Sequence, residues 1–244
     1  MYFNDTNRAA YRSLHNGLLF SVVAYRQSDL HIGAPEAAAE RVWAKARDVL
    51  PALRRPLDDY AGTHRDFVKT LEPFPISPDM PPIAREMCHV TACVGVGPMA
   101  AVAGAVNDFL AEELLPLSDE LILENGGDLY IKTTSERIVL VYAGASPLSG
   151  RLGIRVPQGV WGVCTSSATV GPALSFGQAD AALVVAESSA LADAAATGLG
   201  NRVNVCGDIE KALQWTLAIA GVSGALAIVG GAFGVMGDVE LVRV

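Results

Sequence analysis

The sequence predicts an α+β fold in which mixed or antiparallel sheets pack against helices. Apolar segments of strand length follow one another along the chain, and only a few helical segments interrupt them. The chain has 244 residues, of which 51% are hydrophobic, so it can bury a large core. We expect one domain over residues 1–244, with a strand and a helical layer in residues 1–70 and a site-bearing core in residues 83–244.

The first third of the chain is expected to form a hairpin and two helices before a proline-rich connection. The polar turn Arg26–Asp29 separates two strand-like runs, and Pro35 suits the first turn of an Ala-rich helix. Glu72–Pro82 contains five prolines, which exclude regular structure and predict a surface connection. The expected elements are strands Phe20–Tyr25 and Leu30–Ile32 and helices Pro35–Leu50 and Arg54–Val68.

The remaining elements are mostly strands. Pro98 opens one helix and Pro116 stops it, while Ser188 or Ser189 caps an Ala-rich helix that ends in glycines. Thr134–Glu136 is expected to join two strands as a hairpin. The expected strands are Val90–Val94, Glu120–Glu124, Leu129–Thr133, Arg137–Tyr142, Arg151–Val156, Val160–Cys164, Ala181–Ala186, Ala225–Val229 and Val239–Val242. The expected helices are Pro98–Leu115, the Ala-rich helix from Ser188 or Ser189 to Gly198–Gly200, and Ile209–Ala220.

Composition excludes several classes of protein. The net charge is −8, which disfavours a nucleic-acid partner. Ala212–Gly237 carries no charge, but its six glycines favour buried helix and strand, or a subunit interface in a homo-oligomer, over a membrane span. Met1–Phe20 has no secretory pattern, and the cysteines form no CxxC pair; they are expected to be small buried residues in a reducing compartment, and we expect a cytoplasmic protein. The cysteines are Cys88, Cys93, Cys164 and Cys206.

One glycine pattern imitates a dinucleotide-binding fingerprint. Gly95-Val-Gly97-Pro-Met-Ala100 fits G-x-G-x-x-G/A, and Glu124 ends a later strand where an acid would contact a ribose. However, the chain continues into a hairpin, and Pro98 lacks an N–H for a phosphate. A glycine hinge before a packed helix is therefore the stronger interpretation, and NAD-type binding is the weaker one.

Three further patterns could bind a ligand, and each also has a local structural explanation. Asn125-Gly126-Gly127-Asp128 allows close approach to the backbone, but it also suits an ordinary turn. The hydroxyl cluster Thr165-Ser166-Ser167-Ala168-Thr169 could bind phosphate or cap backbone groups. Asp193 and Thr197 lie one helical turn apart and offer hard oxygen ligands for Mg²⁺. The alternative is a solvated Asp193 carboxylate and a Thr197 hydroxyl that bonds to its own backbone. The flanking alanines would leave room for a bulky ligand over that helix face.

Taken in order, these patterns resemble the ApbE family of Mg²⁺-dependent flavin transferases. The similarity rests on Asn125–Asp128, Thr165–Ser167 and the run Val184-Val185-Ala186-Glu187-Ser188 that leads into Ala192-Asp193-Ala-Ala-Ala-Thr197. A short, mostly uncharacterised branch of the superfamily is more similar still, over most of the chain, including Ala143–Gly150 and Cys164–Asn201. The resemblance implies an ApbE-like fold.

The resemblance also implies an activity and a site. Family members cleave FAD and attach FMN to a threonine of an acceptor protein, so FAD or a related nucleotide diester is the implied ligand and Mg²⁺ the implied cofactor. Asp193 and Thr197 would be the catalytic metal ligands. Asn125, Gly126, Gly127 and Asp128 would contact the flavin or its adenosine, and Thr165, Ser166 and Ser167 would line the same cleft.

The chain departs from the family pattern in two places. Gly171–Gly177 stands where the transferases carry His-x-x-Asp-Pro, and Pro172 occupies the position of a histidine in the close branch. The helix start Pro98–Gly104 also lacks the family's lysine. Three functions therefore stay open: an FMN transferase or FAD pyrophosphatase, a non-catalytic flavin- or nucleotide-binding module, and a protein-interaction module with a degenerate site.

Overall fold

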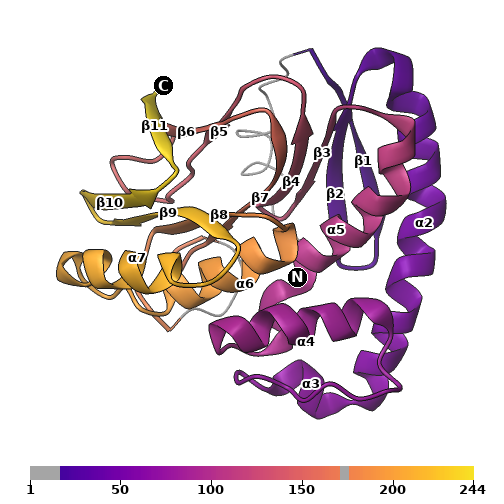
Figure 1. Cartoon of the computed structure of the whole chain (residues 1–244), viewed down its shortest axis with the longest axis horizontal. Helices are drawn as coiled ribbons and strands as arrows, with labels where there is room; N and C mark the ends of the chain where they lie inside the picture. The colour runs from indigo at the N-terminus through magenta and orange to yellow at the C-terminus, as the bar shows by residue number, and fades with distance from the viewer. Residues whose placement is uncertain (1–16, 171–175) are drawn as a thin grey trace.

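The computed structural model describes residues 17–170 and 176–244, which form two antiparallel sheets and several helices (Figure 1). Eight strands build the large sheet, in which every neighbouring pair is antiparallel. The predicted α+β class is therefore confirmed. In spatial order the strands are β1 (Leu19–Tyr25), β2 (Ser28–Ala34), β3 (Leu121–Asn125), β4 (Asp128–Thr133), β7 (Gly159–Ser166), β8 (Ala181–Ala186), β9 (Val222–Val229) and β10 (Ala232–Gly237).

A smaller sheet covers part of one face of the large sheet. It consists of β11 (Glu240–Arg243), β6 (Leu152–Val156) and β5 (Arg137–Leu140). Between the two sheets lies a compact apolar cluster that includes Ile131, Val163 and Leu183 from the large sheet and Ile154 from the small one. Strand β8 is buried on both faces, because its alternate residues belong to this cluster and to the cluster under the helices.

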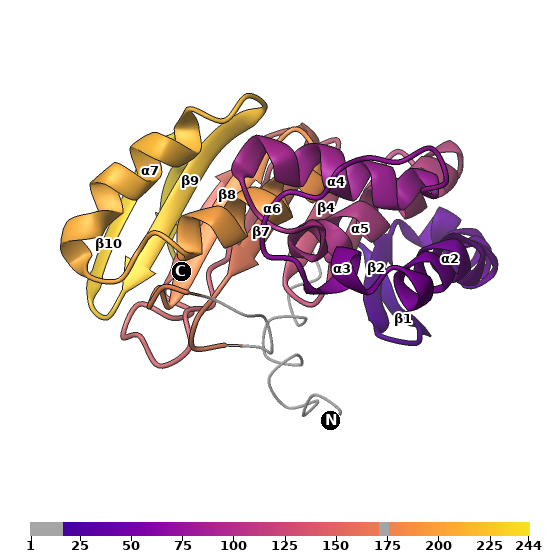
Figure 2. The same ribbon diagram turned by 90° about the horizontal axis from the view of Figure 1, so that it is seen from below.

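Helices cover the opposite face of the large sheet (Figure 2). Helix α2 lies over β1 and β2, α5 over β3 and β4, α6 over β7 and β8, and α7 over β9 and β10; α4 packs outside α5 and α6. The helices are α2 (Glu36–Thr63), α3 (Arg65–Lys69), α4 (Pro82–Val94), α5 (Val102–Leu114), α6 (Ser189–Gly200) and α7 (Ile209–Leu217), with 3-10 turns η1 (Pro98–Ala101), η2 (Leu115–Leu117) and η3 (Cys206–Asp208).

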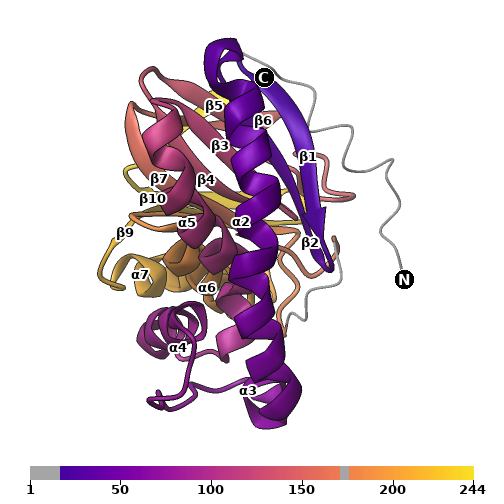
Figure 3. The ribbon, with the colours of Figure 1, turned by 90° about the vertical axis from the view of Figure 1, so that its right-hand side faces the viewer.

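Two predicted elements in the N-terminal half are wrong. The break expected between Leu50 and Arg54 is absent, because one long helix, α2, runs through Pro51 and Pro56 and ends at Thr63, before the short α3 (Figure 3). An internal proline costs about 3 kcal/mol, but α2 buries a continuous apolar face and Trp43 donates a hydrogen bond to the carbonyl of Ile32 at 2.9 Å. The expected strand Val90–Val94 is the last part of helix α4, whose apolar residues recur at helical spacing.

Two further differences concern strands. Thr134–Glu136 does not close a hairpin: β4 pairs with β3 and β7 in the large sheet, while β5 crosses to the small sheet and pairs with β6. The hydroxyl of Thr133 accepts hydrogen bonds from the Ser135 N–H and from Arg137, and these redirect the chain. Strand β10 was not predicted, because its two glycines, Gly234 and Gly237, weaken the strand pattern.

The uncharged stretch Ala212–Gly237 contributes the end of α7, the buried strand β9 and the edge strand β10. No single helix in the described part of the chain is long and apolar enough to span a membrane. One helix pair, Pro82–Val94 with Pro98–Leu117, meets that criterion together but is bent by 102°.

Candidate functional site

Two carboxylates approach each other between the large sheet and its helices. Asp193, in α6, accepts a hydrogen bond from the Gly104 backbone N–H at 2.9 Å. Asp128 is the first residue of β4, and its carboxylate lies near the Cys164 thiol and the Thr165 N–H, which both favour its charged form. Burial raises the pKa of Asp193 well above its usual value, and the negative charge of Asp128 raises it further. Burial likewise raises the pKa of Asp128 to about 7, with a smaller contribution from Glu124.

Helix α6 is held in place by its N-terminus. The carboxylate of Asp108, in α5, accepts the backbone N–H groups of Ser189 and Ala190 at 2.9 and 2.8 Å, and Ser188 caps the helix by accepting the Leu191 N–H. Desolvation raises the pKa of Asp108 to about 6 despite these bonds. The predicted serine cap is therefore confirmed, and the carboxylate of Asp108 reinforces it.

Small residues let α6 approach its neighbours closely. A Cβ on Gly104 would lie 2.2 Å from the carbonyl oxygen of Ser189, and a Cβ on Gly162 would lie 2.2 Å from that of Ser188. Ala192 and the run Ala194–Ala196 are almost completely buried. The expectation that these alanines leave room for a ligand is therefore wrong, because their small size serves the packing of α6 into the core.

A tight turn closes the hairpin between β3 and β4. Gly126 and Gly127 have φ values of +73° and +109°, which favour glycine, and the Gly127 N–H donates to the carboxylate of Glu124 at 2.9 Å. Asn125 and Asp128 are paired with each other at the ends of β3 and β4, so the turn itself consists of Gly126 and Gly127. The local interpretation of Asn125–Asp128 as a hairpin turn is therefore confirmed, and the turn also borders a cavity.

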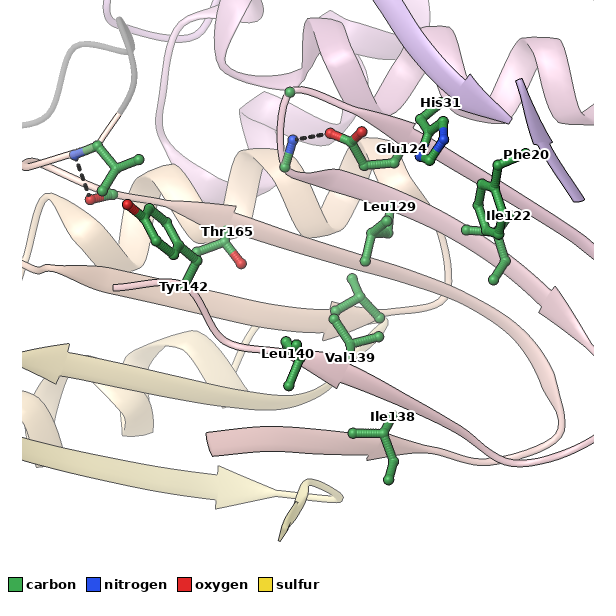
Figure 4. Close-up of a pocket in the computed structure, with 15 residues that line it drawn as sticks. Phe20, His31, Ile122, Glu124, Leu129, Ile138, Val139, Leu140, Tyr142 and Thr165 are labelled. Atoms are coloured by element: carbon green, nitrogen blue, oxygen red, sulfur yellow. Dashed lines mark hydrogen bonds between the residues drawn. The ribbon is translucent and has the colours of Figure 1, made fainter. Parts of the chain in front are cut away.

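The cavity, of about 230 Å³, lies on the face of the large sheet that looks toward β5 (Figure 4). Its walls are mainly apolar, and polar groups gather at two places, around His31 and Glu124 and around Thr165 and Ser167. The lining residues are Phe20, His31, Ile122, Glu124, Gly126, Gly127, Leu129, Ile138, Val139, Leu140, Tyr142, Val163, Thr165, Ser167 and Val170.

The cavity and the carboxylate pair meet at strand β7. Ladder pairing between β4 and β7 stops at Leu129↔Val163, while β7 continues to Ser166 beside β8. The Thr165 side chain lines the cavity, and its backbone N–H lies near the Asp128 carboxylate. A ligand in the cavity would therefore lie close to the end of the sheet at which the carboxylates are held.

The predicted site residues thus divide between two faces of the sheet. Gly126, Gly127, Thr165 and Ser167 line the cavity, whereas Asp128 and Asp193 are on the helical side. The amide of Asn125 binds the Ala103 carbonyl at 3.3 Å, also on the helical side. Two predicted residues belong with α6: Ser166 is buried and lies near Gly200, and Thr197 follows Asp193 by one turn and is half-buried.

The hydroxyl of Ser167 also caps local backbone groups. It accepts the backbone N–H groups of Thr169 and Val170 at 3.1 and 3.0 Å, so it caps the end of β7 while it lines the cavity. Pro172 and the rest of residues 171–175 lie outside the described residues.

The glycine pattern at Gly95–Ala100 is not a dinucleotide site. Gly95 ends helix α4 with φ of +79°, so a helix and not a strand precedes the pattern. Gly97 packs against the chain, since a Cβ there would lie 2.0 Å from the carbonyl oxygen of Thr70. The interpretation as a hinge between two helical segments is confirmed.

Several site residues were not predicted, because they come from distant parts of the sequence. Phe20 and His31 enter the cavity from β1 and β2, and Tyr142 from the segment after β5. The one available signal was Glu124, a carboxylate in an apolar strand. In the described part of the chain, no three His, Cys, Asp or Glu side chains group closely enough to hold a metal ion by themselves.

Two solved structures described as ApbE flavin transferases have the same architecture. The apo form of the Pseudomonas stutzeri flavinyl transferase ApbE superposes with a TM-score of 0.60 at 15% identity, covering 90% of this chain and 94% of that one. The flavin transferase ApbE from Vibrio cholerae gives 0.62 at 13% identity, covering 90% and 96%. This chain therefore has the ApbE-like fold that the sequence predicted.

Sequence comparison assigns the family within that fold. The model described as AbpE bacteria matches residues 12–235, and the chain belongs to this family. A UPF0280 protein of Methanocella arvoryzae is 42% identical over 186 residues, which are 75% of this chain and 76% of that protein. A UPF0280 protein of Methanothrix thermoacetophila is 38% identical over 201 residues, or 81% and 84% of the two chains.

Proposed function

We propose that the chain binds FAD or a related nucleotide diester together with Mg²⁺ and breaks its pyrophosphate bond. The observation that carries the proposal is the pair Asp128 and Asp193, two carboxylates held together where burial disfavours their charges. Both residues are half-buried, and a partly desolvated pair of carboxylates costs free energy unless a cation or protons compensate it. The fold is that of proteins described as flavin transferases, which supports a flavin nucleotide as the ligand.

The donor set fits a hard divalent cation. Carboxylate and hydroxyl oxygens are the ligands that Mg²⁺ prefers, and Mg²⁺ commonly completes its coordination with water and substrate phosphates. Asp193, Asp128 and Thr197 would hold the ion together with water and substrate phosphates. Such a site does not need a cluster of three acidic, histidine or cysteine side chains. When bound, the ion would neutralise charge on the pyrophosphate as the phosphoryl group is transferred.

The chain's own groups orient this pair. The Gly104 N–H fixes one oxygen of Asp193, while the Thr165 N–H and the Cys164 thiol lie near the Asp128 carboxylate and favour its ionised form. In the proposed reaction a hydroxyl of water or of an acceptor threonine forms a bond to the FMN phosphorus. The bond from that phosphorus to the bridging oxygen breaks, AMP leaves with the bridging oxygen, and the hydroxyl proton passes to solvent.

Sequence departures favour a second candidate, a module that binds the nucleotide without turnover. Pro172 replaces a histidine of the close branch, and the residues 98–104 contain no lysine. Such a module would keep the carboxylate pair and lose the groups that assist transfer. A protein-interaction module with a degenerate site would need neither Mg²⁺ nor a nucleotide.

Titration calorimetry of the full chain with FAD, ADP and FMN, with and without Mg²⁺, followed by product analysis, separates these candidates. The proposal predicts FAD binding that depends on Mg²⁺ and weakens at least tenfold in Asp193→Asn, which keeps an oxygen acceptor for Gly104. Asp48→Asn, an exposed position on α2, is the matched control and should bind normally. Mg²⁺-independent binding, or no binding, would refute the proposed role of the pair.

A further inference from the structure

We propose that Asn107, in helix α5, is a positioning residue that sets the separation of the two carboxylates Asp128 and Asp193. The inference rests on the proposed function and adds to it, by naming the part of the chain that keeps the pair ready for a divalent cation. Asn107 acts through the backbone of Asp128, because its side-chain amide donates a hydrogen bond to the Asp128 carbonyl at 2.9 Å.

One turn of α5 holds both strands of the β3–β4 hairpin at the point where the chain turns. The amide of Asn125, at the end of β3, donates to the Ala103 carbonyl at 3.3 Å. The amide of Asn107 donates to the carbonyl of Asp128, at the start of β4. Ala103 and Asn107 are four residues apart in the helix, so they lie on the same helix face. The two amides therefore fasten both ends of the glycine turn to a single turn of α5.

The same helical turn also holds Asp193. Gly104 is among the first residues of α5, whose N–H groups have no carbonyl partner within the helix, and it donates its N–H to the Asp193 carboxylate at 2.9 Å. Helix α5 thus bonds to the side chain of one carboxylate residue and to the backbone of the other. The separation of the pair therefore depends on the bond from Asn107 as well as on the bond from Gly104.

The position of Asp128 is not fixed by the large sheet alone. The ladder between β4 and β7 begins one residue later, at Leu129, so the ladder partner of Asp128 is Asn125, across the turn. The turn itself consists of two glycines, which restrain the backbone less than any other residue. The bond from Asn107 supplies a restraint that neither the ladder nor the turn provides.

Packing does not by itself favour asparagine at this point of α5. The Asn107 side chain is fully buried, and its Oδ1 has no hydrogen-bond partner among the described residues. A buried acceptor without a partner destabilises a protein, whereas alanine has no such atom and has a higher helix propensity. The amide nitrogen, which bonds to Asp128, therefore accounts for the residue better than the packing of the core does.

Two variants and one matched control test the inference. Asn107→Ala removes the amide, and Asn107→Leu fills the same space without a donor; both residues suit a helix interior. Thr216→Ala is the control, because it also truncates a fully buried polar side chain of a helix. The Thr216 hydroxyl donates to the Ala212 carbonyl within α7, which covers β9 and β10 and not the hairpin.

Two measurements on the full chain are needed. Calorimetry with FAD over a series of Mg²⁺ concentrations gives the Mg²⁺ concentration at which FAD binding is half-maximal. Hydrogen exchange of the ligand-free protein follows the amides of residues 126–129. The first measurement reports on the carboxylate pair, and the second reports on the hold of α5 on the hairpin without any ligand.

We expect both Asn107 variants to raise the half-saturating Mg²⁺ concentration roughly tenfold and to accelerate exchange at residues 126–129, and the control to change neither. A merely structural role would lower stability without changing the Mg²⁺ requirement of the folded protein. An unchanged Mg²⁺ requirement or unchanged exchange in folded variants that bind FAD would overturn the inference and leave the proposed function standing. If the wild type binds FAD without Mg²⁺, or not at all, the proposed function is refuted and the inference with it.

Discussion

Replacing Asp128 by asparagine is expected to stabilise the ligand-free protein at alkaline pH while weakening its ligand binding. Burial raises the pKa of Asp128 from 3.8 to about 7, so in the folded protein the ionised form is penalised. Between these two values the folded protein holds a proton that the unfolded chain releases. The free energy of unfolding therefore falls as pH rises from about 4 to about 7 and then levels off.

The magnitude follows from the same two pKa values. At about 1.4 kcal/mol per pKa unit, the difference corresponds to at most about 4 kcal/mol. Asparagine removes this cost, but its amide nitrogen, unlike a carboxylate oxygen, cannot accept a hydrogen bond, so favourable contacts with the nearby Cys164 thiol and Thr165 N–H are partly lost and so is part of the gain. We expect a net gain of roughly 1–3 kcal/mol at pH 8.5 and a much smaller one at pH 5.

Urea unfolding in EDTA at pH 5 and pH 8.5 measures both differences, with Asp48→Asn as the control. A variant that is less stable than the wild type at pH 8.5 would refute the reasoning, as would a wild-type stability that does not fall over this range. Adding Mg²⁺ with FAD at pH 8.5 should then stabilise the wild type and not Asp128→Asn, by about 2.7 kcal/mol at a ligand concentration of 100 times Kd.

Two other changes test how α6 is held. Gly104→Ala should lower the free energy of unfolding by roughly 1–3 kcal/mol, because the new Cβ would meet the backbone of Ser189. Gly62→Ala is the control, since its Cβ would point into open space from α2, and it should raise the free energy of unfolding by roughly 0.5–1 kcal/mol. Equal urea midpoints for the two variants would contradict the close packing of α5 on α6. Asp108→Ala removes the acceptor for two N–H groups at the start of α6 and should cost about 1–2 kcal/mol. Hydrogen exchange should show the faster opening first at Ser189 and Ala190, and unchanged rates there would contradict the cap.

Sequence patterns predicted the sheets well where strands alternate or are continuously apolar. β8 is an example, because an apolar run bounded by turns has few alternatives. Prediction failed where a local rule was overridden by packing. Pro51 and Pro56 suggested a break that the buried face of α2 prevents, and Val90–Val94 has strand-forming residues but lies on the apolar face of α4.

The site was predicted only in part, for a topological reason. Gly126–Gly127 and Asp193 were recognisable because each belongs to a short contiguous pattern. The cavity was not recognisable from the sequence, because His31 and Glu124 come together only through the pairing of β2 with β3. About ninety residues separate the two in the sequence, so no local pattern contains both. Whether Asp193 and Thr197 bind a metal stays a prediction.

The most direct test of the central claim is product analysis after incubation of the full chain with FAD and Mg²⁺. Chromatography should show FMN and AMP in equal amounts, or AMP with FMN attached to an added threonine-containing acceptor protein, and neither product in EDTA or with Asp193→Asn. Intact FAD after prolonged incubation with folded, FAD-binding wild-type protein would contradict the proposed cleavage and leave a nucleotide-binding module.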